Sequence, residues 1–422
     1  MTTEVLTFGC RLNAYESAVI RDLAAGQENT SPDTVPDTVV VNTCAVTAEA
    51  ERQCRKAIRR LHRDRPGARI VATGCAVQLD PDAWAALPGV HRVLGNAEKL
   101  RPESWAPGAR PRVSDIMAVR EAAPHLATGF DGRARAFVEI QQGCDHRCTF
   151  CIIPFARGPS RSVPTGGIVQ QVRTLVAAGY KEVVLTGVDI SSYGADLPGG
   201  GPPLGAMARR LLALVPDLPR LRLSSLDPAA IDPAVWARVA HEPRLMPHLH
   251  LSVQAGSDLI LKRMRRRHGR DGALAAIDRA RMLRPGIAVG ADLIAGFPTE
   301  TEALFRDTLA FVDEAALPYL HVFAYSERPG TPAARMPAVP DAERRERAAR
   351  LRAAALPHAA AFHAGLVGRT VQVVAERGGG HTEHFAPIRL AQAAPPGTLL
   401  AVRVAAADAA GLHAAGASPH SS

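Results

Sequence analysis

The sequence is poor in aromatic residues and contains no long apolar run. Phe, Trp and Tyr make up 5% of the 422 residues, which argues against an extended platform on which nucleic-acid bases stack. No stretch of about 18 apolar residues occurs, so no membrane-spanning helix is expected. The first residues, MTTEVLTFGC, lack the basic and apolar regions of a secretory signal. These absences favour a cytoplasmic protein whose thiols stay reduced.

Cysteines are few, but three of the seven stand close together as Cys144, Cys148 and Cys151, in a C-x3-C-x2-C array. An odd number of cysteines does not suit a disulfide framework, and clustered thiols in a reducing compartment indicate metal binding or catalysis. A structural zinc site needs four ligands, so His146 would have to serve as the fourth, and zinc remains an alternative. Three thiolates on an iron–sulfur cube leave one iron open for a substrate or cofactor, and this is the favoured interpretation.

The charge balance favours a polyanionic partner. Lys and Arg number 50 against 41 Asp and Glu, which gives a net charge of +9. Such an excess suits nucleic acid, although an Arg-rich composition without a charged partner would produce the same number. A basic run at 262–268, KRMRRRH, either contacts phosphates or forms a solvated helix end. The length predicts more than one domain.

The first hundred residues predict an open parallel α/β sheet. Short β-rich runs at 4–8, 38–41, 69–73 and 90–94 alternate with stretches of helical period. Alternation of this kind is typical of parallel α/β domains. The segment 101–135 has no clear period, contains four prolines and is expected to be a linker.

From residue 136 to 355 the alternation resumes on a larger scale. Six candidate strands predict a partial (βα)6 TIM-like barrel, at 136–141, 182–187, 220–225, 248–253, 288–294 and 319–325. In such barrels the functional side chains lie at the carboxyl ends of the strands. A helix at 341–355 should lead to a small β-barrel at 366–410, followed by a disordered tail at 411–422.

Three further cysteines follow the first three predicted strands. Cys10, Cys44 and Cys75 stand just beyond the carboxyl ends of these strands, where open α/β sheets place their ligands. They predict a second three-thiol site with one iron open. Cys54 differs, because it shares a helix face with Ala57, Ile58 and Leu61, and it is expected to be an ordinary buried residue.

Several stretches together resemble a methylthiotransferase of the radical S-adenosylmethionine (SAM) superfamily, over nearly the whole chain. TFGCRLNAYES, VVNTCAVTAEAERQCRKAIRR and VATGCAVQ resemble the methylthiotransferase domain. GCDHRCTFCIIPFARGPSRS resembles the radical SAM core, and GRTVQVVAERGGGHTEHFAPIRL resembles the small RNA-binding TRAM barrel. The resemblance implies two [4Fe-4S] clusters and SAM as cofactors, tRNA as partner, and an electron donor that the sequence does not identify.

The resemblance also implies roles for individual residues. Phe150 would pack on the SAM adenine, with Gly187 and Asp189 at its amino or ribose groups. Ser225, Gln254 and Asp292 would hold polar parts of SAM or substrate. NTCAVTAEAERQCRK and HVFAYSERPGTPAA are similar to the branch that modifies threonylcarbamoyladenosine at position 37 of tRNA. The carboxylate of that base needs a cationic partner, for which Arg157, Arg161 and Arg328 are the candidates, with Tyr325 also reaching the site.

Two other classes of function stay open. A sister enzyme would act on isopentenyladenosine-37 tRNA or on an aspartate of a ribosomal protein, although the basic character of GRTVQVVAERGGGH disfavours a protein substrate. A non-catalytic Fe–S or zinc protein that binds RNA is the second alternative. Two three-thiol sites with open positions argue against it.

Overall fold

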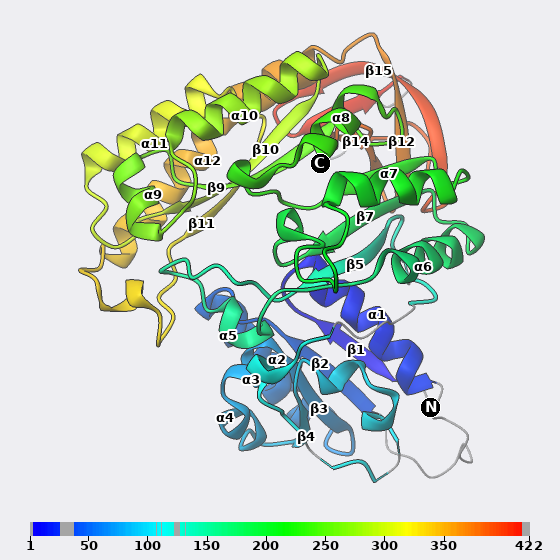
Figure 1. The fold of residues 1–422 in the computed structure, drawn as a ribbon, viewed down its shortest axis with the longest axis vertical. Coiled ribbons are helices and arrows are strands. Elements are labelled where there is room, and N and C mark those ends of the chain that lie inside the picture. Colours follow the sequence, from blue (N-terminus) through cyan, green and yellow to red (C-terminus); the bar gives the residue numbers. More distant parts are fainter. Residues whose placement is uncertain are drawn as a thin grey trace.

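The computed structural model describes residues 3–25, 38–106, 108–110, 112–121, 127–130 and 132–415. These residues form an N-terminal α/β domain, a larger central α/β part and a small C-terminal β-barrel (Figure 1). The central part lies between the other two in this view. Of the helices that the structure describes, none has the length and apolar character needed to cross a membrane.

The N-terminal domain contains a four-stranded parallel sheet in the order β1-β2-β3-β4, as predicted. Its strands are β1 (Glu4–Thr7), β2 (Thr38–Thr43), β3 (Arg69–Gly74) and β4 (Val90–Leu94). Its helices are α1 (Arg11–Ala25), α2 (Ala48–Asp64), α3 (Cys75–Leu79) and α4 (Pro81–Ala85). The apolar run Val39–Val41 is fully buried, as expected for a strand covered on both faces.

The segment between the first two domains contains only short turns of 3-10 helix among its described residues. These are η1 (Glu98–Leu100), η2 (Pro102–Ser104) and η3 (Ile116–Ala118). Residues 107, 111, 122–126 and 131 of the predicted linker lie outside the described residues. The linker boundaries of 101 and 135 therefore stay a prediction.

The central part contains the six predicted parallel strands in two sheets. The first has the order β6-β5-β7-β8 and the second β11-β10-β9. The strands are β5 (Ala136–Gln142), β6 (Arg161–Ser162), β7 (Glu182–Gly187), β8 (Arg220–Leu223), β9 (His248–Gln254), β10 (Ala288–Ala295) and β11 (Tyr319–Ala324). Single bridges from Leu221 to Leu245 and from Leu226 to Leu251 join the sheets. With the short antiparallel β6 as the one addition, this is a partial (βα)6 barrel.

Helices and short turns connect the barrel strands. They are α5 (Ile153–Arg157), α6 (Thr165–Ala177), η4 (Ile190–Ser192), α7 (Leu204–Leu214), η5 (Pro228–Ala230), α8 (Pro233–His241), α9 (Asp258–Met264), α10 (Arg270–Leu283), α11 (Glu302–Glu314) and η6 (Pro332–Arg335). The short α5 packs away from the barrel. Its residue Ala156 and the preceding Ile152 are buried in the core of the N-terminal domain, together with Ile58 and Trp84.

The last helix is longer than predicted. It runs as α12 (Asp341–Ala364), not 341–355, and includes Pro357 in its interior. A proline normally ends a helix because it removes one backbone hydrogen bond, which is why the prediction stopped short. Contacts of α12 with α11, β10, β11 and β15 extend along the helix, and buried Ala355 and Ala359 stand on either side of the proline.

The C-terminal part is a closed five-stranded barrel in the order β12-β13-β14-β16-β15. Its strands are β12 (Thr370–Glu376), β13 (Gly379–Thr382), β14 (Pro387–Arg389), β15 (Leu399–Asp408) and β16 (Gly411–Ala414). The predicted tail at 411–422 was therefore wrong at its start, because residues 411–414 close the barrel. The Asp408 carboxylate accepts hydrogen bonds from the backbone N–H groups of Ala410 and Gly411, which turns the chain into β16. Residues 416–422 lie outside the described part.

The C-terminal barrel is attached to the amino ends of β7 and β8. Arg220 and Arg222 each donate a hydrogen bond to the carbonyl oxygen of Thr382, at 3.0 and 2.7 Å. Glu182 pairs with both guanidinium groups, at 2.7 and 2.8 Å. All three side chains are nearly fully buried, so the small barrel covers the end of the central barrel opposite the functional strand ends.

Candidate site between two sets of cysteines

The N-terminal cysteines converge as predicted. Cys10 follows β1, Cys44 follows β2, and Cys75 is the first residue of α3, after β3. Gly9 has a φ of +99°, and a Cβ added there would lie 2.7 Å from the Sγ of Cys44. Only glycine therefore permits the loop carrying Cys10 to approach Cys44 so closely.

Buried amides hold this first set of cysteines in place. Asn13 donates to the backbone carbonyls of Phe8 and Thr43, at 2.7 and 3.0 Å. Asn96 donates to the carbonyl of Ala156 at 2.7 Å, and its Nδ2 lies 3.9 Å from the Sγ of Cys75. The amides also contact the sulfurs, since the Cys10 thiol donates to Oδ1 of Asn13 at 3.8 Å. None of the three cysteines forms a disulfide.

The second set lies in a tightly folded loop after β5. The N–H of Cys144 donates to the carbonyl of Gly158, and the N–H of Cys151 donates to that of Cys148, both at 3.1 Å. Gly143 has a φ of +69°, and a Cβ there would lie 1.9 Å from the carbonyl oxygen of Pro159. The loop consequently requires glycine at this position.

Gln141 organises this loop, and the sequence interpretation missed it. Its Nε2 donates to the carbonyl of Gly143 at 2.8 Å, and its Oε1 accepts from the N–H groups of Val188 and Asp189, at 3.0 and 2.8 Å. The side chain is fully buried. It thereby connects the cysteine loop to the end of β7. The available signal was a polar residue at the end of a predicted strand, directly before the cysteine loop.

The cysteine sulfurs alone favour an iron–sulfur cube over a single zinc ion, although Cys144 forms a compact group with His146 and Asp189 that could also hold a metal ion. Among the described residues, neither set has its three sulfurs within 4.8 Å of one another. Thiolates on one zinc ion, with Zn–S bonds of about 2.3 Å, would lie about 3.8 Å apart. On a cube each thiolate binds a different iron, so the sulfurs stand further apart. His146, the possible fourth zinc ligand, pairs instead with Asp189 at 2.9 Å.

The burial of the cysteine thiols also favours a bound metal cation at both sets of cysteines. It raises the pKa of the Cys44 and Cys144 thiols to about 12 and that of Cys151 to about 11. A thiol must lose its proton to become a metal ligand, and the positive charge of iron supplies the compensation that the protein surroundings lack.

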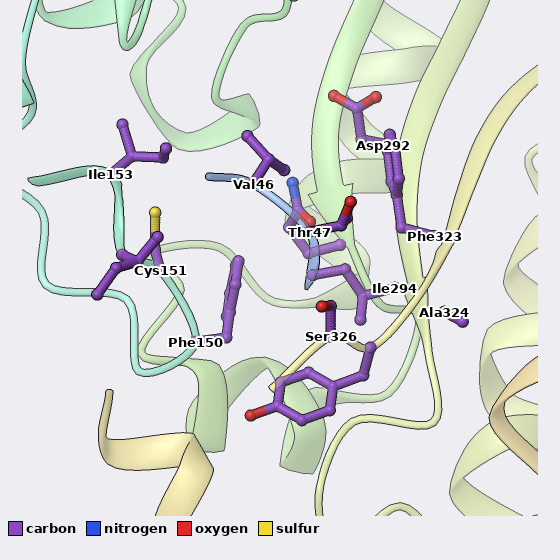
Figure 2. Close-up of a pocket in the computed structure, with 13 residues that line it drawn as sticks. Val46, Thr47, Phe150, Cys151, Ile153, Asp292, Ile294, Phe323, Ala324 and Ser326 are labelled. Carbon is purple, nitrogen blue, oxygen red and sulfur yellow. The ribbon is translucent and has the colours of Figure 1, made fainter. Parts of the chain in front are cut away.

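Two adjoining cavities occupy the space between the sets. One has a volume of about 240 Å³ and is lined by Cys151, and the other has a volume of about 690 Å³ and is lined by Cys10 and Cys44. Both are lined by Val46, Thr47, Asp292 and Phe323. Figure 2 shows Val46 and Thr47, from the loop after Cys44, on the same cavity as Phe150 and Cys151. The N-terminal domain therefore forms one wall of the barrel's site.

Most of the residues expected at SAM line these cavities. Phe150, Gln254 and Asp292 lie beside Cys151, while Gly187 and Ser225 line the larger cavity. Asp189 lines neither cavity, because it is bound to His146 and Ser192. A Cβ on Gly187 would lie 2.6 Å from the carbonyl of Gln141, so this glycine permits close packing at the end of β7.

Asp292 stands between two imidazoles that sequence reasoning did not identify. Its Oδ1 lies 2.9 Å from Nε2 of His250 and 3.2 Å from Nδ1 of His321, and Ser225 donates to its other oxygen at 3.1 Å. These hydrogen bonds hold the pKa of Asp292 below its usual range against the opposing effect of burial. Asp292 is consequently an ionised acceptor at the junction of the two cavities.

The three candidate arginines are all engaged with other groups. Arg157 is 2% exposed and binds Glu16, at 2.8 and 3.0 Å. Arg161 donates to the carbonyls of Pro159 and Arg157, at 2.8 and 2.9 Å. Arg328 pairs with Glu51 at 2.9 Å. None lines either cavity, and their expected contact with the substrate carboxylate stays a prediction.

Tyr325 lies at the candidate site, whereas part of the basic run packs against Asp227. Tyr325 lines the smaller cavity, with the Arg344 guanidinium 5.2 Å from its ring centre. In the run at 262–268, Arg266 and Arg267 pair with Asp227, at 3.4 and 3.0 Å, and of the two only Arg266 is withdrawn from solvent, since Arg267 is exposed. Arg265 remains exposed.

Comparison with known proteins agrees with this geometry. Residues 138–312 match the radical SAM superfamily, and residues 2–95 match the uncharacterized protein family UPF0004. The chain is 48% identical to the threonylcarbamoyladenosine tRNA methylthiotransferase MtaB of Rickettsia prowazekii, over 92% of this chain and 91% of that one. Identity to the MtaB of Bacillus subtilis is 38%, covering 78% and 74% of the two chains. A tRNA-2-methylthio-N(6)-dimethylallyladenosine synthase of Erythrobacter litoralis is 37% identical, covering 90% and 87%.

A solved structure shares the fold. The radical SAM methyltransferase TsrM of Kitasatospora setae, with cobalamin and a [4Fe-4S] cluster bound, superposes with a TM-score of 0.54 at 14% identity, covering 79% of this chain and 76% of that one. The matches over both domains, together with the two convergent sets of cysteines, lead to one conclusion. The chain belongs to the radical SAM methylthiotransferase family, whose cofactors are [4Fe-4S] clusters and SAM.

Proposed function

We propose that this protein methylthiolates C2 of N6-threonylcarbamoyladenosine at position 37 of tRNA, in the cytoplasm and with an external one-electron donor. One observation carries the proposal: two adjoining cavities are lined by cysteines of both sets, Cys151 from the barrel set in one and Cys10 and Cys44 from the N-terminal set in the other. One set belongs to the radical SAM barrel and the other to the N-terminal domain. A substrate base in the larger cavity would be accessible from both.

The reaction requires radical chemistry because the hydrogen on C2 of adenine is not acidic, and a side chain acting as general base would not remove it. Cys144, Cys148 and Cys151 would hold a cluster that would supply the electron for reductive cleavage of SAM, and Cys10, Cys44 and Cys75 would hold a second cluster that would supply the sulfur chemistry. The protein holds the reacting atoms in position and excludes side reactions.

We assign the contacts to cofactor and substrate from the residues that line the two cavities. Phe150 would pack on the SAM adenine, since its ring lines the smaller cavity beside Cys151. Gln254 and Asp292 would accept hydrogen bonds from the polar groups of SAM, and Ser225 would orient Asp292. Gly187 would allow close approach of the ligand at the end of β7.

The choice of substrate rests on the degree of similarity. The MtaB of R. prowazekii is 48% identical, against 37% for the dimethylallyladenosine enzyme of E. litoralis. The isopentenyl-type tRNA is therefore the second candidate substrate.

The experiment compares three tRNAs that bear threonylcarbamoyladenosine, isopentenyladenosine or unmodified adenosine at position 37. Reconstituted enzyme, SAM and a reductant are incubated with each, and the nucleosides are analysed by mass spectrometry. We expect a methylthio product from the threonylcarbamoyl tRNA alone. A product from the isopentenyl tRNA alone would assign the protein to the sister branch. Reaction of a ribosomal protein instead of any tRNA would overturn the nucleic-acid substrate.

A further inference from the structure

Arg11, directly after Cys10, is a cation without an anionic partner in the part of the chain that the structure describes. No acceptor lies within hydrogen-bonding distance of its guanidinium among those residues, and its closest recorded aromatic contact is the ring of Phe385, 5.8 Å away. Arg11 lines the larger cavity next to Cys10, and it also lines a neighbouring cavity of about 390 Å³ that reaches Phe385. A half-buried arginine of this kind is rare, because a buried charge is normally paired.

Arg11 is also the one permanent cation among the described residues that line the larger cavity. The other arginines near the cysteines are occupied: Arg157 by Glu16, Arg328 by Glu51, and Arg266 by Asp227 together with the carbonyl of Ser252. Asp292 on the same wall attracts Arg11 only from a distance: the two form no ion pair within 4 Å, and Asp292 is bound by His250 and His321. In the larger cavity, Arg11 is therefore the residue that could bind an anion.

The surroundings of Arg11 strengthen its preference for an anion. Arg135 and Arg222 lie with it around Phe385, with guanidinium carbons 4.9 and 5.2 Å from the ring centre. Burial and these two neighbouring cations both disfavour an unpaired charge on Arg11, which stays protonated at neutral pH. A carboxylate bound to Arg11 would compensate for the burial of its charge and for the repulsion from Arg135 and Arg222.

We infer that Arg11 pairs with the carboxylate of the threonylcarbamoyl group and thereby selects the substrate, an inference that rests on the proposed function. The planar guanidinium can hold a carboxylate through two parallel hydrogen bonds. His321, half exposed on the same wall, can donate to the carbamoyl or hydroxyl oxygens of the group. An isopentenyl side chain would leave Arg11 buried and unpaired, which disfavours that substrate.

The test compares two tRNAs on each enzyme preparation. One bears threonylcarbamoyladenosine at position 37, and the other bears the same nucleoside with its carboxylate converted to the methyl ester. Wild type, Arg11→Gln and Arg11→Lys are assayed for kcat/KM of methylthiolation and for the Kd of each tRNA. The ratio between the two tRNAs does not depend on the active fraction of a preparation, so partial loss of a cluster at the adjacent Cys10 cannot imitate the result. Arg52→Gln, on the exposed face of α2, is the matched control.

We expect wild type and Arg52→Gln to prefer the carboxylate over the ester by about 30-fold or more, the ratio that corresponds to about 2 kcal/mol. Arg11→Gln should reduce this preference to within about threefold in both kcat/KM and Kd, and Arg11→Lys should restore part of it. An unchanged preference in Arg11→Gln would overturn the inference. So would an Arg328→Gln variant that loses the preference while Arg11→Gln keeps it. If wild type fails to modify either tRNA but modifies isopentenyl tRNA, the proposed function fails instead.

Discussion

The guanidinium of Arg157 and the carboxylate of Glu16 form a buried pair that joins the end of α5, just after the radical SAM cysteines, to α1, the first helix of the chain. The distances are 2.8 Å to Oε1 and 3.0 Å to Oε2. Lys99 binds the same carboxylate at 2.7 Å, and both Glu16 and Lys99 are fully buried. The two cations hold the pKa of Glu16 at about 2 against the effect of burial. One carboxylate therefore neutralises cations from two domains.

Replacing Glu16 by Gln should destabilise the protein strongly. Arg157 and Lys99 would then be buried without a counter-charge, and removing one member of a buried ion pair typically costs about 3–5 kcal/mol. Chemical denaturation followed by far-UV circular dichroism measures the change. Glu49→Gln is the control, because Glu49 pairs with Arg52 at the surface and should cost no more than about 1 kcal/mol. Equal stability of the two variants would show that the buried pair contributes nothing.

Cys148→Ala should abolish the reductive cleavage of SAM. With only Cys144 and Cys151 left, the barrel cluster would lose one of its three thiolates. We expect no 5′-deoxyadenosine after addition of dithionite, measured by liquid chromatography. Formation of this product at the wild-type rate would contradict the assignment of the barrel cluster.

Changing Cys10, Cys44 and Cys75 together to Ala should separate the two clusters. About half of the iron should be lost, since one of two cubes would lack its thiolates. Cleavage of SAM should continue while the methylthio product disappears. Iron analysis with parallel assays of both products checks this, and a full iron content would mean that the N-terminal cysteines hold no cluster.

Cys54→Ser serves as the cysteine control. Cys54 is fully buried on α2 and packs in the core of the N-terminal domain with Ile58 and Trp84. Iron content and activity should be retained, while the hydroxyl buried in apolar surroundings should cost about 1–3 kcal/mol of stability. Loss of iron from this variant would make Cys54 a ligand.

His384 should make stability depend on pH. Burial, and then the nearby arginines, lower the pKa of this imidazole to about 4 in the folded protein, whereas an unfolded histidine titrates near 6.5. Between these values the unfolded chain binds more protons, so stability should fall as the pH drops from about 6.5 toward 4. His384→Gln should show a shallower decrease between pH 7.5 and 5.5 in denaturation midpoints. Parallel slopes for the two proteins would exclude His384 as the source.

The sequence predicted the parts of the site that depend on local pattern. Cys10, Cys44 and Cys75 were placed at one edge of the sheet because the carboxyl ends of parallel strands meet there, and the structure brings them together. The six barrel strands followed from their alternation with helices. The predicted strand at 182–187 has the same bounds as β7.

What the sequence did not predict depends on partners far apart along the chain. Arg157 was expected at the substrate because it lies in a loop near the barrel cysteines, but its partner Glu16 lies 141 residues away. Arg11 carried no local signal of an unpaired charge, since pairing is a property of the folded surroundings. Strand β16 was missed because GLHA has little β-propensity and is held as the fifth strand by β14 and β15.

The residues next to Cys151 have a consequence for how the protein is made. Ile152 and Ala156 belong to the barrel by sequence order but complete the core of the N-terminal domain. During synthesis the N-terminal domain leaves the ribosome first. Its core is completed only later, when Ile152 and Ala156 have been made. An isolated barrel fragment beginning at residue 136 would expose these side chains. Its cysteine loop would also lack the N-terminal domain against which it packs. The two domains should therefore be expressed and engineered as one unit.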